Sequence, residues 1–181
     1  MSMPKKNIFK LDVVSVRLVK DTPLYSEVEI KTPEDAIRLM GETLCSMDRE
    51  LVCVLNLNSA GQPINCNIVS MGALDSAMAH PREILKATFL SNAASIVLVH
   101  NHPSAKLTPS KYDVTLTDRM KKICDLIGIE LIDHIIVGGD NQSYYSFRKM
   151  DMIKASNLNF ATTPKCINWD FPLLVEEGKK R

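Results

Sequence analysis

The sequence predicts an α/β domain in which a mixed β-sheet is flanked by helices. The first observation behind this prediction is that apolar runs typical of buried strands alternate with segments whose apolar residues recur at helical spacing. The second is that short turns in places join two strand-like runs directly, so that these neighbours are expected to form antiparallel hairpins. Helices between strands, combined with hairpins, favour a mixed sheet over a parallel one.

The first 70 residues are predicted to supply a strand, a helix and a hairpin. Residues 11–19 alternate between apolar and polar side chains, which indicates a half-buried strand. Thr32 has the side chain of a helix N-cap and Pro33 suits the first helical position, so a helix is expected to begin here. The apolar run at 51–58 predicts a strand buried on both faces, and residues 64–70 are expected to return beside it after a turn.

A second helix is predicted to begin at His80, which precedes a proline, and to end near Asn92. His80 is interpreted as a residue of the helix start and not as part of a site. The apolar residues that follow, at 95–102, predict a strand that ends in His100 and His102.

The last elements are a third helix and two strands. Thr108 and Pro109 are predicted to cap the helix, whose apolar residues share one face and which Gly128 ends. The run at 130–138 predicts another strongly apolar strand, and residues 143–147 are expected to follow a turn as a short final strand. These segments complete the predicted mixed sheet.

The chain is expected to divide into three parts. Residues 1–29 would supply the N-terminal strand and a connection, residues 30–149 the central α/β domain, and residues 150–181 a C-terminal extension of unknown structure. A length of 181 residues fits one domain with short extensions.

Composition and charge are those of an ordinary globular protein. Apolar residues make up 45% of the chain and charged residues 24%, which is sufficient to bury a core. The 22 Lys and Arg residues are almost balanced by 21 Asp and Glu residues, so the net charge is only +1. A charge this small does not indicate binding to nucleic acid or to an acidic membrane.

The compartment is predicted from cysteine usage and from targeting signals. The sequence has no apolar run approaching the roughly 20 residues that cross a bilayer, and its N-terminus lacks the apolar core of a signal peptide. The five cysteines are odd in number, widely spaced and form no Cys-x-x-Cys pair, which favours buried reduced thiols. We therefore expect a cytoplasmic protein without a membrane partner.

The segment that indicates chemistry is the end of the strand at 95–102. His100 and His102 are two residues apart, so their side chains leave the same face of the strand. Their Cα atoms are expected to lie roughly 7 Å apart, close enough for both imidazoles to bind one metal ion. A His-x-His pair is also compatible with a simple polar rim of the sheet. An apolar strand that runs directly into two of the four histidines favours the metal site.

The third helix is expected to bring a carboxylate to the same place. Asp113 lies near the start of this helix, and Ser110, three residues earlier, shares its face. Two imidazole nitrogens and one carboxylate leave a fourth tetrahedral position for water, as in catalytic zinc sites. Such an ion lowers the pKa of bound water and polarises a carbonyl group. The sequence therefore predicts one catalytic Zn²⁺, with Ser110 placed to stabilise an oxyanion.

These residues also carry a resemblance to a known family. His-x-His, seven residues, Ser, two residues and Asp is similar to the signature of the MPN/JAMM metalloprotease domain. The flanking segments resemble the bacterial RadC-like branch of that family, and the similarity covers roughly residues 30–148. The segments that carry it are His80-Pro81-Arg82-Glu83, the block LVHNHPS, Thr108-Pro109-Ser110 and Asp133-His134-Ile135-Ile136-Val137-Gly138.

The resemblance implies a cytidine-deaminase-like α/β architecture and zinc bound by His100, His102 and Asp113, with Ser110 holding the water or the oxyanion. It further implies a glutamate at the junction between the first family helix and the next strand, where Glu50 stands. Glu50 would act as general acid/base, taking a proton from the zinc-bound water and passing it to the leaving amine. Glu83 is the rival for this role, although the first turn of a helix suits it to a dipole-favouring one.

The sequence departs from the family pattern in two respects. Ala105 stands where RadC-like proteins usually carry glycine after the HNHPS block, so a stiffer loop is expected. The helix-hairpin-helix region that often precedes this domain is not recognisable, which removes the part most easily linked to DNA. His134, in an apolar strand, is interpreted as a structural histidine with satisfied hydrogen bonds and not as a ligand.

Three functions are compatible with these features. The first is a zinc metallopeptidase or isopeptidase whose substrate is an unidentified peptide or isopeptide. The second is a DNA-repair-associated accessory module with little or no hydrolytic activity, for which nucleic-acid binding is possible but not supported by the charge. The third is a metal-free interaction module, which would be expected to lack one or more of the ligands present here. The oligomeric state is not predicted.

Overall fold

The structure is a computed structural model that describes residues 17–20, 29–72, 79–140 and 142–156, together with Ser15 and Leu158. Eight elements follow one another along these segments: α1 (Pro33–Cys45), β1 (Leu51–Leu57), β2 (Pro63–Met71), α2 (Pro81–Leu90), β3 (Ser95–Asn101), α3 (Lys111–Ile127), β4 (Glu130–Val137) and β5 (Tyr144–Ser146). None of the helices in these segments is both long enough and apolar enough to cross a membrane.

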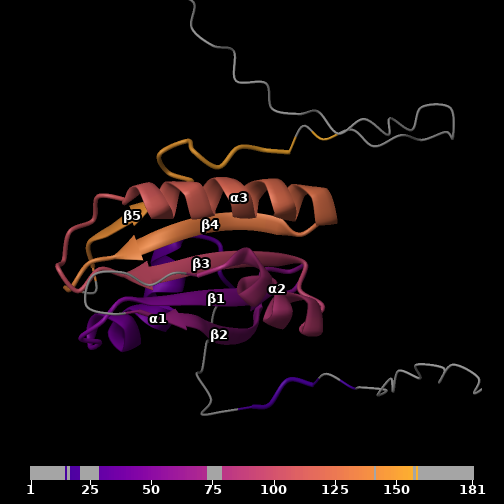
Figure 1. The fold of residues 1–181 in the computed structure, drawn as a ribbon, viewed down its shortest axis with the longest axis horizontal. Helices are drawn as coiled ribbons and strands as arrows, with labels where there is room; N and C mark the ends of the chain where they lie inside the picture. The colour runs from indigo at the N-terminus through magenta and orange to yellow at the C-terminus, as the bar shows by residue number, and fades with distance from the viewer. Residues whose placement is uncertain are drawn as a thin grey trace, which may run out of the picture.

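The five strands form one mixed sheet in the order β2-β1-β3-β4-β5 (Figure 1). β1 pairs antiparallel with β2 and with β3, and β4 pairs antiparallel with β5. β3 and β4 are parallel, and α3 is the crossover helix between them. The predicted mixed α/β class and both predicted hairpins are confirmed.

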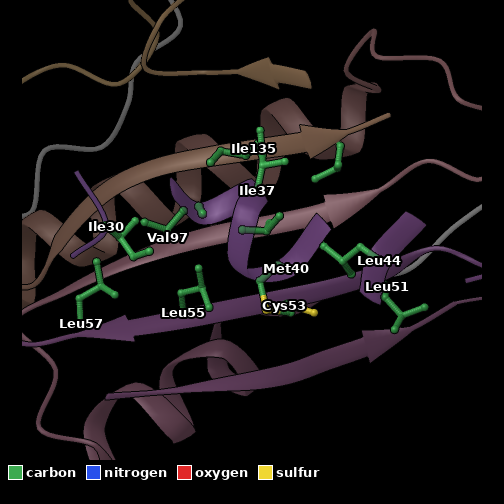
Figure 2. Packing of buried hydrophobic residues seen from close by; sticks show 13 residues of the cluster. Ile30, Ile37, Met40, Leu44, Leu51, Cys53, Leu55, Leu57, Val97 and Ile135 are labelled. Atoms are coloured by element: carbon green, nitrogen blue, oxygen red, sulfur yellow. The ribbon is translucent and has the colours of Figure 1, made fainter. Parts of the chain in front are cut away.

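Alternating side chains divide the sheet into two buried faces. On one face, α1 packs Met40 and Leu44 onto Leu51 and Leu55 of β1, together with side chains of β3 and β4 (Figure 2). On the other face, Val52 and further apolar residues of β1, β3 and β4 pack against α2 and α3. The domain therefore has three layers, and β1 and β3 are buried along their whole length because helices cover both of their faces.

Local signals explain where the helices begin and end. Thr32 caps α1 in a capping box with Asp35, and His80 caps α2 by accepting a hydrogen bond from the Arg82 backbone N–H. Gly128 ends α3 in the left-handed conformation at φ 73°, as its sequence position indicated.

Two predictions about these elements need correction. α3 begins at Lys111 with Ser110 as its N-cap, so Thr108 and Pro109 precede the helix and do not cap it. The reason is the capping box between Ser110 and Asp113, which satisfies the backbone N–H groups at the start of the helix. A strand was predicted at 11–19, but its described residues 17–19 are exposed and do not form a strand. They lack a pairing partner, since the five strands of the described sheet pair only with one another. The remaining residues of this predicted strand, apart from Ser15, and most of the extension at 150–181 lie outside the described residues.

Candidate metal centre

The two predicted histidine ligands meet at the C-terminal end of β3. His100 belongs to the strand, pairs with Val52 of β1 and is only 1% exposed. His102 follows directly after β3 and is partly buried. Their Nε2 atoms lie 3.1 Å apart, so both imidazoles point at one location.

Asp113 reaches the same location from the first turn of α3. Its backbone N–H donates to the Ser110 hydroxyl, and its Oδ2 accepts from the Ser110 backbone N–H at 2.6 Å. This capping box fixes the carboxylate so that Oδ1 lies 3.4 Å from His100 Nε2 and Oδ2 lies 3.7 Å from His102 Nε2. The same contacts that begin the helix therefore also aim its carboxylate into the site.

Glu50 completes the cluster from the residue before β1. Its side chain is buried, with 8% exposed, and its backbone carbonyl accepts from the Gly72 N–H at 2.9 Å. One ligand atom from each of Glu50, His100, His102 and Asp113 lies within 4.8 Å of all the others. Two imidazoles and two carboxylates thus converge from three separate segments of the chain.

The spacing of these atoms fits a small tetrahedral cation. Bonds of about 2.0–2.1 Å in tetrahedral geometry separate two ligand atoms by about 3.3 Å. The separations of 3.1 Å between the histidine nitrogens and 3.4 and 3.7 Å to the Asp113 oxygens are close to this value. In addition, His102 Nδ1 lies 2.6 Å from the Lys106 carbonyl oxygen, which can only accept, so Nδ1 carries a proton. The cluster could therefore hold a metal ion.

Electrostatics at the site would couple the binding of a metal ion to the release of a proton. Burial lowers the pKa of His100 well below its usual value, so this ring is neutral. The hydrogen bond with Asp113 raises the pKa of His102 despite partial burial. Burial raises the pKa of Asp113, but its hydrogen bond with His102 and the nearby His100 outweigh this and lower the pKa. A cation that replaces the His102 proton keeps the Asp113 charge compensated.

The structure separates the two glutamates considered for a catalytic role. Glu50 lies in the cluster, whereas Glu83 lies in the first turn of α2 with its side chain 43% exposed. The Glu83 carboxylate pairs with Lys86 at 2.6 Å, which lowers its pKa. Ser110 adjoins the cluster as the N-cap of α3, and a hydroxyl that accepts a hydrogen bond keeps its own proton to donate.

Three buried polar residues around the cluster were not predicted to serve it: Asn101, Thr117 and His134. The Asn101 side chain is hydrogen-bonded to the backbone on both sides of Glu50. The Thr117 hydroxyl donates to the backbone carbonyl oxygen of Asp113 in α3. His134 has hydrogen-bond partners at both ring nitrogens, as expected of a structural histidine, but one of them is His100. For His134 the only signal in the sequence was a polar residue inside an apolar strand, and this signal does not identify its hydrogen-bond partner.

The mixed sheet and the buried His-His-Asp-Glu cluster define an α/β protein with a candidate metal site. Residues 30–152 match the family model of the RadC-like JAB domain, and the chain belongs to this family. A UPF0758 protein of Desulforamulus reducens is 43% identical over 120 residues, covering 66% of this chain and 52% of that protein. A UPF0758 protein of Staphylococcus epidermidis is 40% identical over 124 residues, covering 68% and 54%. The chain thus spans about half the length of these relatives, whose name states no activity.

Proposed function

We propose that this chain is a zinc-dependent hydrolase that cleaves peptide or isopeptide bonds. The observation that carries the proposal is the convergence of Glu50, His100, His102 and Asp113 at the end of β3. Three of these side chains are buried and His102 is partly so, an arrangement in which unpaired charge is costly and a cation is stabilising. Membership of the JAB domain family agrees with hydrolase chemistry at such a site.

In this proposal His100, His102 and Asp113 hold the zinc ion. When bound, zinc would supply Lewis acidity, which polarises a carbonyl group and makes water a stronger acid. Two nitrogens and one oxygen are a ligand set that zinc accepts while a position stays open for substrate or water. The three residues also hold one another in register through contacts of 3.1 to 3.7 Å before any ion is present.

Glu50 is proposed to move the proton that the reaction requires. Its carboxylate accepts a proton from the water that attacks the carbonyl carbon, and it then delivers this proton to the leaving nitrogen as the C–N bond breaks. The products are a carboxylic acid and an amine, so one water molecule is consumed for each bond cleaved. The Ser110 hydroxyl is proposed to donate a hydrogen bond to the oxygen that becomes negative during the attack.

The proposed substrate class is a peptide or a lysine-linked isopeptide. Both contain the amide that this set of residues is suited to cleave, and the net charge of +1 gives no reason to propose nucleic acid instead.

The free cysteines of the described residues, Cys45, Cys53, Cys66 and Cys124, support a reducing compartment such as the cytoplasm.

The test begins with metal content. The protein is purified without chelator or histidine tag, and zinc is quantified by mass spectrometry in the wild type, His102→Ala and Glu50→Gln. We expect about one zinc per chain in the wild type and in Glu50→Gln, and none in His102→Ala. A wild type that takes up no zinc even after zinc is added back would overturn the proposal.

Turnover is then measured on quenched fluorescent peptides and lysine-branched isopeptides. Glu50→Gln should keep its zinc and lose hydrolysis by at least about a hundredfold, the lower end of what general acid–base catalysis contributes. Glu83→Gln is the matched control, because Glu83 is exposed and outside the cluster, and it should hydrolyse like the wild type. Equal turnover by Glu50→Gln and the wild type would exclude Glu50 from this role.

A further inference from the structure

A buried histidine outside the ligand cluster is hydrogen-bonded to a ligand. His134 Nε2 lies 2.8 Å from His100 Nδ1, and His134 Nδ1 lies 2.6 Å from the Thr117 hydroxyl. His100, Thr117 and His134 are each at most 4% exposed. The ring of His134 also stacks on Phe147, with centroids 5.0 Å apart and planes inclined by 10°. His134 is therefore held in one orientation by contacts on its edge and on its face.

The direction of each hydrogen bond follows from the far end of this chain of contacts. The Thr117 hydroxyl lies 2.6 Å from the backbone carbonyl oxygen of Asp113, which can only accept, so the hydroxyl donates there. The hydroxyl oxygen must then accept from His134 Nδ1, which consequently carries a proton. A neutral imidazole has one N–H, so His134 Nε2 accepts, and His100 Nδ1 must donate to it.

This proton on Nδ1 determines the state of Nε2, the other ring nitrogen of His100. With the proton on Nδ1, the Nε2 of a neutral His100 carries a lone pair, and this atom lies 3.1 Å from His102 Nε2 and 3.4 Å from Asp113 Oδ1. The Lys106 carbonyl fixes His102 in the same way through its Nδ1. His100 Nε2 thus offers a lone pair, and His102 Nε2 offers a second one at the same point when a cation replaces its proton, which is the pattern that a metal ion requires.

We propose that Thr117 and His134 form a hydrogen-bond relay that holds His100 in the Nδ1–H tautomer and so presents its Nε2 to zinc. Both are positioning residues, since neither ring nitrogen of His134 nor the Thr117 hydroxyl belongs to the cluster of ligand atoms. The relay rests on the proposed function, which makes His100 a zinc ligand, and it deepens that function. Complete burial supports a neutral relay, because a buried imidazole is disfavoured in its charged form and His134 is 0% exposed.

The sheet has a specific irregularity that makes this relay possible. Ile96 and Val97 are neighbours in β3, yet their partners in β4 are Leu131 and Asp133, so β4 contains one additional residue at this point. Beyond it, His134 is paired with Leu98 and Ile136 with His100. An extra residue reverses which face the following side chains occupy, and here it turns His134 towards α3 and the metal centre.

Two pairs of variants test the relay through zinc affinity, measured by competition with a chromophoric chelator. His134→Leu cannot accept from His100, whereas His134→Gln keeps an amide oxygen that can. Thr117→Val cannot accept from His134, whereas Thr117→Ser keeps the hydroxyl. We expect His134→Leu and Thr117→Val to bind zinc about 10- to 100-fold more weakly, the usual effect of losing an outer hydrogen-bond partner. The two conservative variants should stay within about threefold of the wild type.

The tautomers themselves are read from long-range ¹H–¹⁵N spectra of the histidine rings in the metal-free wild type. His100 and His134 should both show a protonated Nδ1, and the signature of His134 should change in Thr117→Val. A proton on Nε2 of His100 or His134, or wild-type zinc affinity in Thr117→Val, would overturn the relay. Because these spectra need no zinc, a protein that binds none would refute the proposed function while the relay is still decided by its tautomers.

Discussion

The side chain of Asn101 is hydrogen-bonded to the backbone on both sides of Glu50. Asn101 Oδ1 accepts from the Leu51 N–H at 2.8 Å, and Nδ2 donates to the Arg49 carbonyl oxygen at 3.0 Å. Backbone pairing between β1 and β3 ends with Val52 and His100. Beyond this pair, the side-chain amide of Asn101 connects the end of β3 to the backbone that precedes β1. The residue between the two histidines thereby fixes the proposed general base relative to the proposed metal ligands.

Asn101→Ala should separate positioning from metal binding. The variant leaves the Leu51 N–H and the Arg49 carbonyl without these partners, which is expected to cost about 2–4 kcal/mol in the free energy of unfolding. The three proposed zinc ligands are untouched, so zinc stoichiometry should be retained while kcat falls at least about tenfold through displacement of the proposed base. Urea unfolding, zinc content and peptide hydrolysis measure these effects. A folded Asn101→Ala protein with wild-type kcat would show that Glu50 needs no such support.

The two residues of the α3 capping box should differ in their effect on metal binding. Ser110→Ala removes the cap, which is expected to cost about 1 kcal/mol of stability, but it leaves the proposed ligands in place. Asp113→Ala removes a proposed ligand together with the carboxylate half of the capping box, and it should lose zinc affinity severely. Chelator competition and urea unfolding of the metal-free variants measure the two effects separately. Equal loss of zinc affinity in both variants would mean that the cap, and not the carboxylate, governs binding.

Ala105 is predicted to store backbone strain beside the candidate metal centre. Its φ of 57° lies in the left-handed region, where a side chain costs roughly 1–2 kcal/mol relative to glycine. Glycine increases the entropy of the unfolded chain, so we expect Ala105→Gly to raise the free energy of unfolding by about 0.5–1 kcal/mol. The stiffer loop expected here from the sequence stays a prediction. Urea unfolding of the two proteins decides the sign, and a less stable glycine variant would contradict the strain.

Most helices and strands of the fold could be predicted from local patterns in the sequence. Helical spacing and strand-like apolar runs located all eight elements, because each depends on residues close together in the chain. His100 and His102 were found in this way, since a spacing of two in a strand places both on one face. Ser110 was placed on the helix but not recognised as its cap, because Thr108 and Pro109 offered an equally good local start.

The residues that the sequence did not reveal depend on pairing between distant segments. Glu50 was named from the family resemblance, because its proximity to the histidines depends on how β1 aligns with β3. The contact between His134 and His100 depends on the additional residue in β4, which no periodicity in the sequence marks. Asn101 bonds to backbone atoms about 50 residues earlier in the chain, and backbone atoms leave no signature in the sequence.

Asp133 is a buried titratable residue outside the proposed set of metal ligands, and it leads to a prediction about pH. The residue is 2% exposed, and its carboxylate accepts hydrogen bonds from the backbone N–H groups of His134 and Arg148 and from the Ser146 hydroxyl. These bonds join β4 to β5 and the turn after it. Burial raises the pKa of Asp133 above its ordinary value of 3.8, and the hydrogen bonds only partly offset this effect.

The sign of the pH dependence follows from proton binding. Because the pKa of Asp133 is higher in the folded than in the unfolded protein, the folded state binds more protons between the two values. The stability contributed by protonated Asp133 is therefore fully present below pH 3.8 and is lost as the pH rises through the pKa of the folded protein.

The variant Asp133→Asn tests this dependence. It keeps an oxygen that can accept from the two backbone N–H groups and an amide that can donate to Ser146, but it does not titrate. We expect the difference in unfolding free energy between Asp133→Asn and the wild type to shift in favour of the variant as the pH rises from 3 to about 6. Urea unfolding of the metal-free proteins across this range measures the difference, and a difference that stays constant with pH would show that Asp133 has the same pKa in both states.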